Sequence, residues 1–269
     1  MKRLISIHGA PRSGTSWLGQ IFDSAPETNY KFQPLFSLSF KDAVHVRSSV
    51  EEIEAYLSEL YQREDDYLDA NYQKDKGIYP VFEKKLNPSV LVTKMVRYHY
   101  MAEPFLKLTI PSHLVFIIRN PCAVIDSWAK ASEKEYLPEW NLEEHWYYAQ
   151  GKNEFRPEEY YGFHRWKELS KMALTLKTHC PEKVHIVQYE ELSANPLEQV
   201  EQMFAHCQLD MDEQTVNFIN QSKSDLNEDY YSVFKANKNV HSWKETLPQY
   251  IIDTIYSELK NTDLEQFLK

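Results

Sequence analysis

The sequence predicts a single α/β domain in which a central parallel sheet is covered by helices on both faces. Its 269 residues are enough to bury the core of one domain. Short apolar runs alternate with longer helical patterns, and the first run leads into a loop with phosphate-binding spacing. Strands that alternate with helices are typical of parallel sheets, because each crossover helix packs back onto a sheet face. We therefore expect one domain over residues 1–269, without repeats or a linker.

Strands and helices can be placed in chain order from these patterns. The expected strands are the apolar runs at residues 4–7, 90–92, 114–118 and 184–187. The expected helices cover 17–22 with an end near residue 26, then 49–70, 158–179, 196–221 and 248–269. The helix at 49–70 is acidic, which is typical of a helix on the surface.

Composition and charge narrow the class of function. A formal net charge of −10 argues against a broad surface for DNA or RNA. The three cysteines (Cys122, Cys180 and Cys207) form no CxxC pair, which argues against a disulfide framework and a structural zinc site. No apolar run approaches the roughly 18 residues of a membrane-spanning helix, and Met1 is followed almost directly by the first strand. We expect a cytoplasmic protein without membrane insertion.

The segment from Gly9 to Ser16 has the spacing of a phosphate-binding loop between a strand and a helix. In that context, backbone N–H groups and a helix N-terminus point at an anion. Thr15 stands where an NTPase carries lysine, and Arg12 supplies the cation instead. A kinase or ATPase also needs a carboxylate for Mg²⁺ after a neighbouring strand, whereas the strand at 114–118 is followed by Arg119. These features predict a nucleotide with an additional phosphate, bound without a metal.

A second motif runs from Arg119 to Ser127. Pro121 suits the first turn of a helix because its φ is fixed near the helical value. Ser127 then lies about two turns into that helix. Arg119 at the strand end and Ser127 on the helix side could therefore face one bound group.

At these residues the sequence resembles the sulfotransferases that use 3′-phosphoadenosine 5′-phosphosulfate (PAPS). Residues 11–17 match the 5′-phosphosulfate loop of that family, and residues 119–127 match its 3′-phosphate motif. The arginine form of the loop and residues 30–36 are most similar to the carbohydrate sulfotransferases. Weaker matches lie at 188–192 and 240–244. The clear likeness covers about the first 36 residues and residues 114–128.

The resemblance implies roles for individual residues. Those that would hold the 5′-phosphosulfate are Arg12, Ser13, Gly14, Thr15 and Ser16. Arg119 and Ser127 would hold the 3′-phosphate, and Tyr189 would border the base. Trp17 would lie against the adenine, although the same position also fits a core aromatic. Trp243 and Lys244 would either close over the nucleotide or cap a surface helix.

The reaction implied by the resemblance is an in-line displacement that is helped by positioning and by cations near developing charge. Arg12 would stabilise that charge. Gln33 stands where the carbohydrate enzymes commonly carry a glutamate, and an amide is not a useful base, so Gln33 would orient the acceptor. His99 is the candidate base because imidazole titrates near neutral pH. If Lys94 is the family's strand lysine, however, the histidine slot is Val96; His45 and an unidentified carboxylate are the alternatives.

The expected acceptor is a hydroxylated small molecule or a glycan. Residues 140–148 and 159–166 are rich in aromatic and hydrogen-bonding side chains that suit sugar rings, although the same spacing fits helices packed on a core. Two other functions are compatible with the sequence: a small P-loop kinase, and a nucleotide-binding module that has lost catalysis, for which Gln33 is the main support. A homo-oligomer is also compatible, but no motif specifies an interface.

Overall fold

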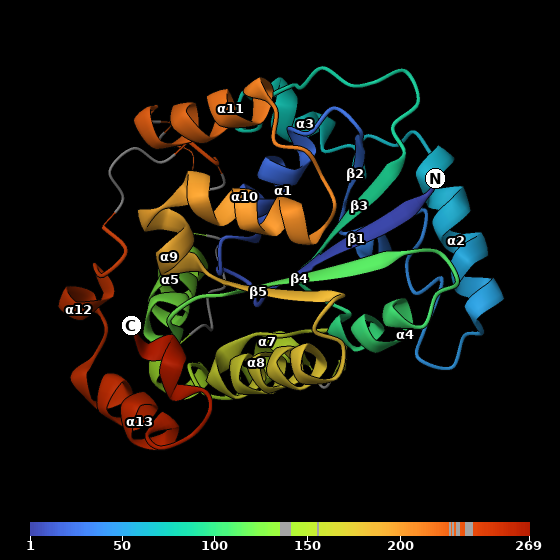
Figure 1. Ribbon diagram of the computed structural model, residues 1–269. Coiled ribbons are helices and arrows are strands. Elements are labelled where there is room, and N and C mark those ends of the chain that lie inside the picture. The colour runs from blue at the N-terminus through green and yellow to red at the C-terminus, as the bar shows by residue number, and fades with distance from the viewer. Residues whose placement is uncertain (135–140, 155, 226, 228, 230–231, 235–238) are drawn as a thin grey trace.

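The computed structural model describes residues 1–134, 141–154, 156–225, 227, 229, 232–234 and 239–269 (Figure 1). Across these residues the chain forms a five-stranded sheet in the order β2-β3-β1-β4-β5, and all neighbouring strands pair in parallel. The strands are β1 (Arg3–His8), β2 (Thr28–Phe32), β3 (Val90–Met95), β4 (Ser112–Ile118) and β5 (Val184–Gln188). The predicted fold class is confirmed.

Helices cover both faces of this sheet (Figure 1). The α-helices are α1 (Thr15–Asp23), α2 (Val50–Gln62), α3 (Asn71–Asp75), α4 (Ala102–Leu106), α5 (Pro121–Lys134), α6 (Leu142–His145), α7 (Gln150–Asn153), α8 (Gly162–His179), α9 (Tyr189–Ala194), α10 (Pro196–His206), α11 (Glu213–Ser224), α12 (Trp243–Thr246) and α13 (Gln249–Leu259). The 3₁₀ helices are η1 (Pro34–Phe36), η2 (His99–Met101) and η3 (Glu265–Leu268). One core cluster joins the sheet to α1, α10 and α11, and a second joins it to α2, α4, α5, α8 and α13.

Strand β2 and several helix boundaries differ from the sequence prediction. β2 is an edge strand with the sequence TNYKF, which lacks the apolar run that revealed the other four strands. Its Lys31 is buried because the ammonium pairs with Asp69 at 2.6 Å. The helix expected at 49–70 ends at Gln62. The patterns at 196–221 and 248–269 are each divided into two helices by a turn.

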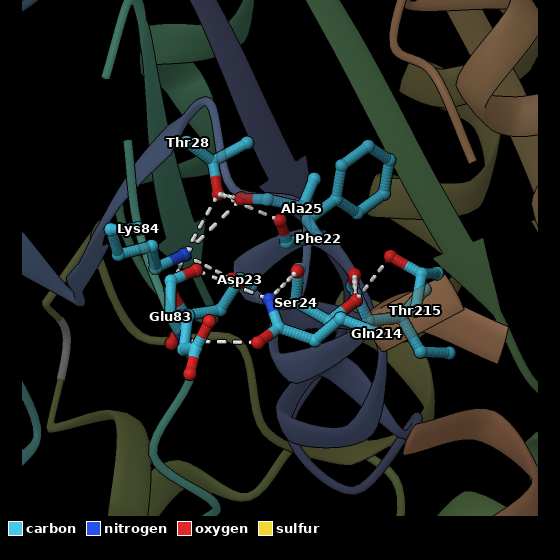
Figure 2. Close-up of polar contacts among 10 residues, drawn as sticks. Phe22, Asp23, Ser24, Ala25, Thr28, Glu83, Lys84, Gln214 and Thr215 are labelled. Atoms are coloured by element: carbon cyan, nitrogen blue, oxygen red, sulfur yellow. Dashed lines mark hydrogen bonds and ion pairs between the residues drawn. The ribbon is translucent and has the colours of Figure 1, made fainter. Parts of the chain in front are cut away.

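A polar network fastens the end of α1, which is the helix that follows the phosphate-binding loop. Figure 2 shows the Lys84 ammonium among acceptors at this end: it pairs with the Asp23 carboxylate at 2.7 Å and donates to the Asp23 and Ala25 carbonyls. A cation suits a helix C-terminus, where the last carbonyls lack intrahelical partners. Gln214, which lies in α11, donates to the Ser24 carbonyl at 2.6 Å (Figure 2). The network thus holds α1 against β2 and α11.

Buried histidines make the folding stability depend on pH. Burial lowers the pKa of His8 to about 3, and the pKa of His113 and of His185 to about 4. In the unfolded chain these groups titrate near the ordinary value of about 6.5, so below that pH the unfolded state binds more protons than the folded state. We expect the free energy of unfolding to fall as the pH decreases from about 6.5 towards 4. Urea unfolding at pH 7.5, 6 and 5 measures this, and a constant value over that range would contradict it.

Candidate active site

The carboxyl ends of all five strands meet at one edge of the sheet, and the predicted site residues follow them. The loop after β1 carries Arg12, Arg119 follows β4, and Tyr189 follows β5. Lys94 lies near the end of β3, and Gln33 follows β2. The chain moves from β1 to one side of the sheet and later to the other, which makes this edge a topological switch point. Ligands of open parallel sheets bind at such points.

The phosphate-binding loop has a strained backbone that packs closely against a tyrosine ring. Gly14 caps the N-terminus of α1 with φ 92°, and Arg12 adopts φ 74°. A side chain at Gly14 would place its Cβ 2.5 Å from the Tyr189 ring. The hydroxyl of Ser13 is buried without a hydrogen-bond partner among the described residues. Together with the first N–H groups of α1, that hydroxyl suits an anion bound in the loop.

The substitution Gly14→Ala tests this close packing. We expect it to lower the melting temperature and to abolish the stabilisation by nucleotides, because the new Cβ would displace the Tyr189 ring as well as strain the backbone. Gly77→Ala is the matched control: Gly77 also has a positive φ, of 65°, but a Cβ there meets nothing within 4 Å. Differential scanning fluorimetry with and without nucleotide compares the two variants. Equal effects of the two substitutions would contradict the importance of the contact with Tyr189.

Arg12, Arg119, Ser127 and Tyr189 form one group. Arg12 Nε donates to Ser127 Oγ at 3.3 Å, and Arg119 Nη1 donates to the carbonyl of Arg12 at 3.0 Å. The Arg119 guanidinium lies 4.7 Å from the centre of the Tyr189 ring, a cation–π distance. Its Nε is buried without a hydrogen-bond partner among the described residues. The structure therefore brings the two sequence motifs together.

Trp17 lies beside this group, whereas Trp243 is part of the protein core. Trp17 is half-buried, its Nε1 donates to Ser222 Oγ at 2.9 Å, and its ring meets Tyr189 edge to face at 6.3 Å. It also packs against the core cluster of α1, and its contact with adenine stays a prediction. Trp243 is buried in the core beside α5, and Lys244 lies 5.6 Å over its ring.

A second polar cluster surrounds Gln33. Gln33 has φ 41°, and its Oε1 accepts from Arg97 Nη1 at 3.0 Å. Arg97 Nε donates to both carboxylate oxygens of Glu159 at 2.8 Å, and the guanidinium lies 4.1 Å from the centre of the Phe36 ring. Glu159 is a buried carboxylate in the segment before α8, and sequence analysis assigned it no role. Arg97 thus holds a neutral amide on one side and a carboxylate on the other.

Lys94 is a site residue to which sequence analysis gave no function. Its ammonium donates to Ser16 Oγ at 3.3 Å and lies 4.0 Å over the ring of Phe32. Burial, together with the charges of Arg97 and Arg12, lowers the pKa of Lys94 to about 7. The sequence signal that could have revealed this residue is a lysine near the end of an apolar strand, β3, which neighbours β1.

The two candidate histidines lie in different surroundings. His99 is fully buried, and its Nδ1 lies 3.1 Å from Nδ1 of His8. Burial and the neighbouring His8 hold the pKa of His99 well below its usual range. His45 is exposed in a turn, where its Nδ1 accepts from the backbone of Arg47 at 3.1 Å. A general base must come within hydrogen-bond reach of the acceptor. Among the described residues, no hydrogen bond or ring contact joins either imidazole to the phosphate-binding loop, so the role of His99 stays a prediction.

Most of the aromatic residues proposed to suit a sugar ring belong to the core. Trp146, Tyr160, Phe163 and Trp166 are buried, whereas Tyr148 is 55% exposed. Trp140 lies outside the described residues. Tyr161 lies beside the Gln33 cluster, where its hydroxyl accepts from Arg97 at 3.4 Å.

Within the described ranges, no cluster of three or more His, Cys, Asp or Glu side chains could hold a metal ion. Cys122, Cys180 and Cys207 are unpaired. In the described part of the chain, no helix has both the length and the apolar character needed to cross a membrane.

A strand–loop–helix phosphate site at the switch point of a parallel sheet defines an α/β nucleotide-binding protein. The sequence model of the sulfotransferase family matches residues 5–213, so the chain belongs to the sulfotransferase family. The predicted family is confirmed, and the assignment favours a sulfotransferase over the P-loop kinase. Comparison with curated protein sequences finds no significant match.

Solved structures share the fold at low sequence identity. A mouse sulfotransferase complexed with PAP has a TM-score of 0.55 and 14% identity, with 100% of this chain and 88% of that chain covered. Retinol dehydratase in complex with androsterone and the inactive cofactor PAP has a TM-score of 0.53 and 15% identity, with 97% and 82% covered. The sulfotransferase domain of the curacin biosynthetic pathway has a TM-score of 0.51 and 15% identity, with 96% and 98% covered.

Proposed function

We propose that this protein transfers a sulfuryl group from PAPS to a hydroxyl group of a carbohydrate or another small hydroxylated acceptor. The observation that carries the proposal is the convergence of Arg12 and Arg119 from the ends of two neighbouring strands, joined by the 3.0 Å contact between Arg119 Nη1 and the Arg12 carbonyl. Ser13 Oγ and Arg119 Nε are buried donors without partners among the described residues. Buried donors of this kind are costly unless an acceptor is bound, and the phosphate oxygens of PAPS are suitable acceptors.

The donor-binding roles are those that the family resemblance implies, and the contacts among Arg12, Arg119 and Ser127 support them. Residues 12–16 would hold the 5′-phosphosulfate, and Arg119 with Ser127 would hold the 3′-phosphate. Trp17 and Tyr189 would contact the base with their rings. PAPS supplies an activated sulfuryl group when it is bound. The Arg12 guanidinium stabilises charge that develops at the end of the loop, and because it is permanently protonated it acts electrostatically and not as an acid.

The acceptor side of the site is formed by the cluster around Gln33. The Gln33 amide, held by Arg97, would orient an acceptor hydroxyl and would not remove its proton. Support for a small hydroxylated acceptor comes from the relatives: solved structures of retinol dehydratase hold androsterone or retinol together with PAP. A carbohydrate is favoured by the arginine form of the phosphate loop and by residues 30–36, which are most similar to the carbohydrate enzymes.

The substitution His99→Ala tests the proposed base. We expect kcat to fall by about 100-fold or more, as for the loss of a general base. Because His99 is fully buried against His8 and Tyr160, we also expect a loss of about 2–4 kcal/mol in the free energy of unfolding. His8→Ala is the matched control, since it removes the other member of the pair. A kcat for His99→Ala that is unchanged, or that falls no further than in the control, would exclude His99 as the base.

Thermal unfolding with PAP, PAPS, AMP and ATP-Mg²⁺ at matched concentrations tests the proposed function. A ligand that binds only the native state stabilises it by about 2.7 kcal/mol at a hundredfold excess over Kd, which shifts the melting temperature by several degrees. We expect large shifts with PAP and PAPS and smaller ones with AMP and ATP-Mg²⁺. A shift with ATP-Mg²⁺ alone would contradict the proposal. Stabilisation by PAPS without turnover of any sugar or steroid acceptor would favour the inactive binding module.

A further inference from the structure

Two buried lysines of the sheet differ in whether a carboxylate pairs with the ammonium. Lys31 and Lys94 are 2% and 3% exposed, and they lie on the neighbouring strands β2 and β3. The Lys31 ammonium pairs with Asp69 at 2.6 Å. Over the residues that the structure describes, Lys94 forms no ion pair with any carboxylate; its neighbours are the Ser16 hydroxyl and the Phe32 ring. A buried ammonium without a counter-ion is costly, and the usual response is loss of its proton.

The charged groups around Lys94, like its burial, favour the neutral amine. Arg12 in the loop and Arg97 after β3 are the charges that disfavour its protonated form, and they add to the effect of burial, so that the pKa falls to about 7. Glu159, the nearest acid of this cluster, is held by Arg97. Tyr79, which hydrogen-bonds to Ser16, and Tyr67, which packs on Phe32, have pKa values raised to about 12 and are therefore neutral. The Glu159 carboxylate thus pairs with Arg97, and among the described side chains no carboxylate pairs with Lys94 itself.

We propose that donor binding is coupled to proton uptake by Lys94: the amine is neutral in the free site and becomes an ammonium when the phosphosulfate enters the loop. The proton comes from solvent, binds the Nζ lone pair, and returns to solvent when PAP dissociates. Ser16, the hydrogen-bond partner of Lys94, lies in the first turn of α1, where the anion would bind, so the phosphosulfate supplies the missing counter-charge. The free site thereby avoids three adjacent positive charges. The inference rests on the proposed function, since it takes PAPS and PAP as the ligands.

Isothermal titration calorimetry in buffers of different ionisation enthalpy measures the coupling directly. At pH 8.5, where the phosphates of the ligand are fully ionised, we expect the full-length protein to take up about one proton per PAPS bound. At pH 6, where Lys94 is already protonated, uptake at this group should vanish. The affinity for PAPS should also fall by up to about tenfold per pH unit above pH 7.5.

Two variants assign the proton to Lys94. Lys94→Met keeps the buried apolar stem without a titratable group, and Lys94→Arg is permanently charged. We expect Lys94→Met to bind PAPS more weakly than the wild type. For both variants we expect an affinity for PAPS that does not change between pH 7.5 and 9, and no proton uptake at pH 8.5. Wild-type binding without proton uptake at pH 8.5, or uptake that persists in Lys94→Met, would overturn this inference alone. Absence of binding of PAPS and PAP to the wild type would overturn the proposed function and this inference with it.

Discussion

Replacement of Arg12 by alanine is expected to lower kcat by at least about 100-fold, on the scale of lost donors at an oxyanion site. The Arg12 guanidinium contacts Ser127 Oγ at 3.3 Å, so it is positioned before the ligand binds and needs little reorganisation during the reaction. Its carbonyl accepts from Arg119 at 3.0 Å, and this backbone contact survives the substitution. Arginine and alanine both carry a Cβ, so the left-handed backbone at this position strains both similarly.

The measurement is the steady-state rate of sulfuryl transfer to the best acceptor found in a screen, with saturating PAPS. Arg47→Ala, the same change at an exposed arginine, is the control and should leave the rate unchanged. Arg12→Lys should recover only part of the rate, because an ammonium keeps the charge but not the planar fork of donors. An unchanged kcat with a raised KM for PAPS would mean that Arg12 contributes to binding alone.

The parts of the fold that could be predicted from the sequence are those in which local pattern and tertiary role coincide. The strands β1, β4 and β5 are apolar because both faces of the sheet are covered, and the apolar residues are visible in the sequence. β2 escaped prediction because the burial of Lys31 depends on Asp69, which is 38 residues away in the chain. A partner at that separation leaves no periodic signal. Helix ends inside long acidic patterns, as at Gln62, were missed for a similar reason: the polar pattern continues past the last helical residue.

The same distinction applies to the candidate site. Arg12 and Arg119 were identified because Arg12 lies in the loop after one predicted strand and Arg119 directly follows another, and parallel strands bring their carboxyl ends to one edge. Glu159 could not be assigned, because its role comes from a contact with Arg97 across 62 residues. His99 was chosen for its chemistry and its place after a strand, but residue type does not reveal that the ring pairs with His8 in the interior. The low pKa of Lys94 likewise depends on its burial in the fold and on two arginines from separate segments.

Replacement of Arg119 by alanine is expected to remove most of the preference for PAP over AMP. The two nucleotides differ by the 3′-phosphate, so the ratio of their Kd values isolates that group. Hydrogen bonds to charged groups contribute about 1.5–3 kcal/mol, which corresponds to a loss of roughly 10- to 150-fold in affinity for PAP. The affinity for AMP should change much less, because the loop after β1 is retained and the backbone carbonyl of residue 119 can still accept from Trp166 Nε1, at 3.0 Å in the wild type.

AMP is therefore the internal control for damage to the fold. Arg119 also contacts the Arg12 carbonyl and the Tyr189 ring, so some loss of melting temperature is expected and would weaken both nucleotides alike. A second variant, Ser127→Ala, removes the other proposed 3′-phosphate contact while leaving Arg119 in place, and should lower the PAP-to-AMP preference by a smaller factor. Equal losses for PAP and AMP in Arg119→Ala would show that Arg119 supports the loop and does not read the 3′-phosphate. Calorimetric Kd values for both ligands with the wild type and the two variants decide between these outcomes.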